Sequence, residues 1–185
     1  MEADWEVEIG GDAPVIDATW PGFVDLRQES GRVVTLREVS ALPSLANALA
    51  RLNAAGSPVW TSKCDVWEED TFDPDEMDAP ASNRASALAC YIDLLPVSDD
   101  EWRIPDQVID ACKATCARLH QVGLRRCRVD LIVRRAFTAK DCPYAITAYL
   151  TACGATLEEA RTNLGAALRA FVDSILCGDD AVTDA

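Results

Sequence analysis

The spacing of apolar residues in this chain of 185 residues changes from a step of three or four to a step of two, and back again. Leu42, Leu45, Leu49 and Leu52 follow the helical step, whereas residues 126–137 alternate between apolar and polar. A step of two predicts a strand with one buried face and one exposed face. Because 49% of the residues are hydrophobic, the chain can also bury a core. These patterns predict an α+β protein.

Each helix expected from this periodicity has a start or stop signal. Thr156-Leu-Glu-Glu159 forms a capping box, Pro105 suits a first helical turn, and Gly56, Gly123 and Gly178 follow the helical patterns. We therefore expect helices over 42–52, 105–121 and 156–175. Period-two or short apolar segments predict strands at 5–9, 15–18, 23–26, 33–36, 59–67, 85–95, 126–137 and 146–150.

This order of elements predicts a mainly antiparallel sheet with three helices packed on one face. Residues 88–177 run strand, helix, strand, strand, helix, which resembles most of a ferredoxin-like, split βαβ unit. Phe23-Val-Asp-Leu26 and Tyr91-Ile-Asp-Leu94 each precede a helix, which raises the hypothesis that the first half is a degenerate duplicate of the second. We expect one domain over 1–178, with an acidic loop at 68–83 and a flexible acidic tail at 179–185.

The N-terminus and the cysteines bear on the compartment. Residues 1–8 are acidic and lack a basic and an apolar region, so they do not resemble a signal peptide, and no apolar window is long enough for a membrane span. We expect a cytoplasmic protein, in which cysteines are buried thiols rather than disulfides. The eight cysteines are Cys64, Cys90, Cys112, Cys116, Cys127, Cys142, Cys153 and Cys177.

Charge is distributed unevenly along the chain. The net charge of −14 argues against nucleic acid and against anionic membranes as partners. Residues 113–140 nevertheless carry eight basic side chains and one acid, a net of +7, which leaves −21 for the remainder. Their alternation predicts a row of guanidinium groups on the exposed face of the 126–137 strand, suited to carboxylates or phosphates. The expected anion-binding or interface residues are Arg126, Arg128, Arg134 and Arg135.

Three interpretations of this arginine row are open. In the first, acids of the same chain neutralise it. In the second, it meets the acidic loop of another copy and forms a homodimer. In the third, it binds a small anionic ligand or a phosphorylated substrate.

Signals for catalysis are sparse. His120 is the only histidine, and Cys112, Cys116 and His120 extend too far along one helix to share a zinc ion. No glycine-rich phosphate-binding loop occurs, so neither metal nor cofactor is expected. Asp93 and Asp130 are the candidates for acid–base chemistry, because both lie in predicted strands, where an inward-facing carboxylate has a perturbed pKa.

The tryptophans and strand pairs raise further expectations. Trp60 and Trp67 lie seven residues apart on one strand, which predicts opposite faces for them. Tyr91 and Asp93 are expected to share a face, as are Lys63 and Asp65.

From these features we expect a non-catalytic binding or assembly protein that forms a homodimer through a sheet face or edge. One alternative is a small enzyme or sensor that binds an anionic metabolite on the row of Arg126, Arg128 and Arg134. Another is a protein whose acidic loop binds a basic partner. The sequence does not decide whether the chain is an enzyme, but it favours a protein that is not one.

Overall fold

A computed structural model describes residues 1–75, 77–79, 85–98, 100–138 and 144–177 of the chain. Its centre is one mixed sheet of six strands. The predicted tail at 179–185, Cys142 and part of the predicted loop at 68–83 lie outside the described residues. The strands are β1 (Glu2–Glu8), β2 (Val15–Asp17), β3 (Val59–Glu68), β4 (Ser86–Pro96), β5 (Cys127–Phe137) and β6 (Tyr144–Gly154).

The sheet is mostly antiparallel, as predicted. Its strand order is β1-β5-β6-β4-β3, and β2 pairs with β5 beyond the end of β1. Only β1 and β2 run parallel to their neighbour β5. β6 lies between β4 and β5 and pairs antiparallel with both, while a helix connects β4 to β5. The ferredoxin-like assignment itself stays a prediction.

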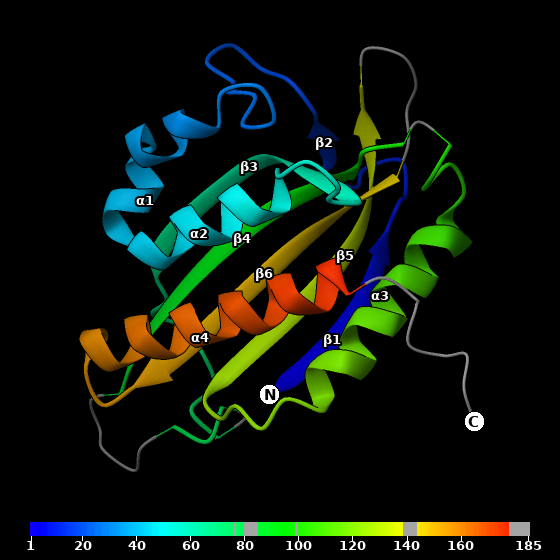
Figure 1. The fold of residues 1–185 in the computed structure, drawn as a ribbon. Coiled ribbons are helices and arrows are strands. Elements are labelled where there is room, and N and C mark those ends of the chain that lie inside the picture. The colour runs from blue at the N-terminus through cyan, green and yellow to red at the C-terminus, as the bar shows by residue number, and fades with distance from the viewer. Residues whose placement is uncertain (76, 80–84, 99, 139–143, 178–185) are drawn as a thin grey trace.

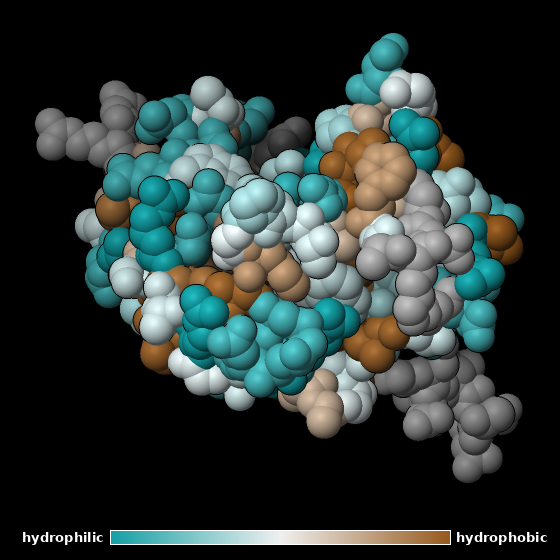
Figure 2. Space-filling view, turned by 90° about the horizontal axis from the view of Figure 1, so that it is seen from above, coloured by the Kyte–Doolittle hydropathy of each residue, from teal (hydrophilic) through white to brown (hydrophobic). Residues whose placement is uncertain are grey.

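Helices cover one face of this sheet (Figure 1). α3 packs on β1, α4 packs on β6, and α2 lies against α4. Seen from above, hydrophilic residues occupy most of the surface, and hydrophobic residues gather in separate patches (Figure 2). The described helices are η1 (Ser30–Thr35), α1 (Arg37–Ala41), α2 (Pro43–Leu52), α3 (Pro105–His120) and α4 (Leu157–Leu176).

The three helices expected from periodicity correspond to α2, α3 and α4. α4 begins at the predicted capping box, where Thr156 Oγ1 accepts a hydrogen bond from the Glu159 backbone N–H at 3.2 Å. Glu159 in turn accepts one from the Ala155 backbone N–H at 2.8 Å. The short helices η1 and α1 were not expected from the sequence.

Two predicted strands are wrong. Residues 23–26 form loop and turn, because Asp25 accepts hydrogen bonds from the backbone and side chain of Arg27, which close a local turn. Residues 33–36 belong largely to the 3-10 helix η1. The proposed duplication therefore loses its support, since Phe23-Val-Asp-Leu26 has no strand to match the strand that contains Tyr91.

A β-bulge in β3 also changes which side chains share a face. The pairing of β3 with β4 shifts between Thr61 and Cys64, so that two residues of β3 lie opposite Asp93. Trp60 and Trp67 pair with Leu95 and Ala89, both odd-numbered residues of β4. The two tryptophans therefore lie on the same face, away from the helices, and the prediction of opposite faces is wrong.

Candidate functional site

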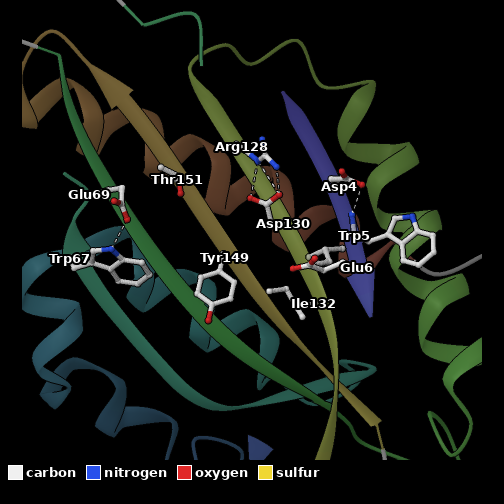
Figure 3. Close-up of a pocket in the computed structure, with 11 residues that line it drawn as sticks. Asp4, Trp5, Glu6, Trp67, Glu69, Arg128, Asp130, Ile132, Tyr149 and Thr151 are labelled. Atoms are coloured by element: carbon white, nitrogen blue, oxygen red, sulfur yellow. Dashed lines mark hydrogen bonds and ion pairs between the residues drawn. The ribbon is translucent and has the colours of Figure 1, made fainter. Parts of the chain in front are cut away.

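The sheet face that the helices leave uncovered, here called the open face, carries polar and aromatic side chains in cross-strand rows. One row runs across the sheet through Asp4, Asp130, Tyr149, Tyr91 and Asp65, which pair in that order. Two tyrosines thus lie between carboxylates on both sides. Figure 3 shows side chains of this face projecting away from the helices behind the sheet.

Both ends of the open face are covered by the chain itself. At one end Trp60 packs with Phe23 and the residues around β2, and Ser62 Oγ donates hydrogen bonds to the carbonyls of Asp17 and Ala18. At the other end Met77 packs over Ala87 and Cys153. With respect to the described residues, the part between these two covers is the surface available to a ligand.

An aromatic cluster of Trp67, Tyr91 and Tyr149 occupies this available part. The ring centroids lie 6.3 Å (Trp67–Tyr91), 6.4 Å (Trp67–Tyr149) and 5.9 Å (Tyr91–Tyr149) apart. The indole N–H of Trp67 donates to Glu69 Oε2 at 2.9 Å, which orients the ring. Burial raises the pKa of Tyr91 to about 12, and the Asp93 and Asp65 carboxylates act in the same direction. The Tyr91 phenol therefore stays neutral at physiological pH.

The arginine row of β5 is neutralised by acids of the same chain. Arg134 donates to Glu8 Oε2 through Nε at 3.1 Å and Nη2 at 2.8 Å, and Arg128 forms an ion pair with Asp130 at 2.9 Å. β1 supplies a parallel strip of acids at its even-numbered positions, because Glu2, Asp4, Glu6 and Glu8 pair with alternate residues of β5. These contacts match the first of the three interpretations.

Two of the expected arginines lie apart from this row. Arg126 precedes β5 with a positive φ of 62°, and its guanidinium pairs with Glu159 in the first turn of α4. Arg135 donates to the Gly10 carbonyl at 3.0 Å and alternates with Arg134 along β5. Of the three arginines expected in the row, Arg128 and Arg134 lie together on the open face, whereas Arg126 is engaged at the start of α4.

Several carboxylates of the open face have no cationic partner in the described part of the chain. From described residues, Asp4 and Asp65 each accept only the backbone N–H of the following residue, at 2.7 and 2.8 Å. Glu6 makes no hydrogen bond or ion pair with a described residue, although it lies beside Ile132 on the neighbouring strand. These three acids flank the aromatic cluster from both edges of the sheet.

Asp93 is the most buried acid of the open face, with 6% of its surface exposed. Thr147 Oγ1 donates to Asp93 Oδ1 at 2.7 Å and receives a hydrogen bond from Arg134 Nη1 at 3.3 Å. Burial raises the pKa of Asp93, against the opposing effects of Thr147, Arg134 and Lys63. As expected, Asp93 shares its face with Tyr91.

A pocket of about 480 Å³ lies on the open face and is drawn in Figure 3. The two candidate acids differ in their relation to it, because Asp130 lines the pocket and Asp93 does not. Arg128 and Asp130 lie side by side in its wall (Figure 3). The lining consists of Asp4, Trp5, Glu6, Trp67, Glu69, Arg128, Asp130, Leu131, Ile132, Tyr149 and Thr151.

Other chemically active side chains are dispersed. Among the described residues, no three His, Cys, Asp or Glu side chains come together as metal ligands would. His120 is exposed at the end of α3. The described cysteines are free, and burial raises the pKa of Cys64 and of Cys112 to about 12. A thiol with such a pKa is a poor nucleophile.

Comparison with known proteins gives no assignment. No family model, no curated protein and no solved structure matches the chain. Among the described helices, none is both long and apolar enough to cross a bilayer.

Sequence reasoning missed the aromatic cluster and the role of β1. The signal for β1 was present, since acids alternate with other residues from Glu2 to Glu8. The position of Trp67 in the cluster had no such signal, because the bulge that brings it onto the face of Tyr91 and Tyr149 leaves no mark in the pattern.

Proposed function

We propose that this is a binding protein whose open face holds a positively charged segment of a partner protein. The observation that carries the proposal is a set of carboxylates, Asp4, Glu6 and Asp65, that have no cationic partner among the described residues and lie around an aromatic cluster. Carboxylates attract ammonium and guanidinium groups, and aromatic ring faces attract them as well.

The charge of the molecule favours the same kind of partner. The net charge is −14, and the arginines of the open face, Arg128 and Arg134, are already engaged with Asp130 and Glu8. A cationic segment would be attracted from a distance and meet complementary charge on contact. An anionic ligand would have to displace these internal ion pairs, so the metabolite-binding alternative has less support.

The position of the acids favours binding over catalysis. Asp93, the acid with a raised pKa, is only 6% exposed and accepts a hydrogen bond from Thr147, so a ligand on the open face would hardly reach it. Asp130 is held by Arg128. We therefore retain the predicted binding role rather than the enzymatic alternative.

The predicted homodimer is a less suitable use of the open face. If the open faces of two copies met, the acids of β1 and those around Trp67 in one copy would approach acids of the other copy. Such contacts between like charges are unfavourable. Self-association through a sheet edge and a cytoplasmic location stay predictions.

The experiment compares two variants of equal net charge. Asp4→Asn/Glu6→Gln removes two charges from the open face, and Asp106→Asn/Asp110→Asn removes two from α3 on the other side of the sheet. The ligand is an octapeptide of alternating arginine and glycine, titrated by calorimetry. We expect the open-face variant to weaken binding by about fivefold or more and the α3 variant by less than about twofold.

Several outcomes would overturn this function. One is no binding of the peptide by the wild type, and another is equal weakening in both variants. Light scattering gives a third: a wild-type dimer that dissociates in the open-face variant would identify a second copy as the occupant.

A further inference from the structure

The protein contains one arginine bound in the way that a partner's arginine could be bound. Arg27 Cζ lies 3.9 Å from the ring centroid of Trp60, at the covered end of the open face. Its guanidinium also reaches Asp25, with Nε 2.8 Å from Oδ1 and Nη2 2.7 Å from Oδ2. One guanidinium is thus held by an aromatic face and by a bidentate carboxylate together.

Trp67 lies on the same strand and the same face as Trp60, and it too has a carboxylate nearby. Because of the bulge, Trp60 and Trp67 both project from the open face of β3. Asp65 lies two residues before Trp67, roughly 7 Å along the strand, and pairs directly opposite Tyr91. An aromatic surface and a carboxylate are therefore neighbours here too.

The difference is that no described cation occupies this second position. Arg134 approaches the third ring of the cluster, with Cζ 5.9 Å from the Tyr149 centroid. In the described part of the chain, no Lys or Arg lies over the rings of Trp67 or Tyr91, and Asp65 forms no ion pair there.

We propose that Trp67, Tyr91 and Asp65 form a binding site for a single arginine side chain of the partner protein. The inference rests on the proposed function and names the residue that anchors the partner. The guanidinium would lie on the Trp67 and Tyr91 rings and donate to Asp65, as Arg27 lies on Trp60 and donates to Asp25.

Arginine fits this site better than lysine for geometric reasons. A guanidinium is flat and stacks on aromatic rings, and its N–H groups can engage both oxygens of a carboxylate at once. An ammonium group is a compact, strongly hydrated charge without a flat face. The indole orientation set by Glu69 keeps the Trp67 ring in place before the arginine arrives.

The test measures a preference rather than binding alone. Titrations compare the arginine–glycine octapeptide with its lysine–glycine counterpart, on the wild type, Asp65→Asn, Trp67→Leu and the control Asp106→Asn. We expect the wild type and the control to bind the arginine peptide about tenfold more tightly than the lysine peptide. In Asp65→Asn and Trp67→Leu this ratio falls to about twofold or less.

The outcomes separate this inference from the proposed function. Equal affinity of the wild type for the two peptides, or an unchanged preference in Asp65→Asn, overturns the arginine site while the general binding function stands. Binding of neither peptide overturns both. Asp65 is half-buried and forms no ion pair with a described residue, so its isosteric variant decides the matter if Trp67→Leu fails to fold.

Discussion

At the scale of single residues, Asp93 is the acid whose surroundings oppose its charge most clearly. It is 6% exposed, and burial raises its pKa above the ordinary value of 3.8. The folded protein therefore holds the Asp93 proton to higher pH than the unfolded chain does. Between the two pKa values the folded state binds more protons, so the contribution of Asp93 to the free energy of unfolding falls as pH rises.

Replacing Asp93 with Asn tests the direction of this change in stability with pH. Asn keeps an oxygen that can accept the hydrogen bond from Thr147 but carries no charge at any pH. We expect the stability of Asp93→Asn relative to the wild type to increase as pH rises above 3.8. Urea unfolding at a series of pH values measures the difference, with Asp106→Asn as the control. A difference that stays constant with pH would contradict the assignment.

At the scale of elements, sequence periodicity located most of the fold. The long strands and the three main helices were predicted because each buries an unbroken apolar stripe, as in Cys127, Val129, Leu131 and Val133 of β5. Periodicity did not predict the β3 bulge, because one extra residue reverses the faces that follow it without changing the local pattern. The wrong prediction for Trp60 and Trp67 follows from that residue, and so does the failure to place Trp67 beside the two tyrosines.

Among the described glycines, Gly154, at the junction between β6 and α4, has the closest neighbours around the position of a Cβ atom. A Cβ atom added to Gly154 would lie 2.7 Å from the Ala160 backbone N and 2.7 Å from Glu159 Cβ. Neither the backbone nor the capped first turn of α4 can retreat easily. We expect Gly154→Ala to lower the free energy of unfolding by about 1–3 kcal/mol, the usual cost of overpacking.

Gly123 is the matched control for this substitution. A Cβ atom there would have no neighbour within 4 Å, so Gly123→Ala should change stability by less than about 0.5 kcal/mol. Urea unfolding of both variants provides the measurement. Equal effects of the two substitutions would mean that the contact at Gly154 does not constrain the junction.

At the scale of the whole molecule, the distribution of charge along the chain differs from its distribution in space. The basic segment of 113–140 is strongly positive in sequence, yet β1 places its acids beside β5 and pairs Glu8 with Arg134. As far as the structure describes the chain, the open face keeps carboxylates without a cationic partner, although it contains the arginine row. The net charges of sequence segments could locate this face. They could not give the sign of its charge, because the parallel pairing of β1 with β5 joins residues far apart in the sequence.

The contributions of the overall charge and of the local face can be separated by salt. Electrostatic screening limits interactions to about 10 Å at 0.1 M ionic strength, so distant acids act on an approaching peptide only in dilute salt. Near about 50 mM NaCl, we expect the open-face variant Asp4→Asn/Glu6→Gln and the α3 variant Asp106→Asn/Asp110→Asn both to slow association of the arginine–glycine peptide. Near about 300 mM, only the open-face variant should still differ from the wild type. Stopped-flow association rates measure this, and a defect of the α3 variant that persists in high salt would place the binding surface on the helical side instead.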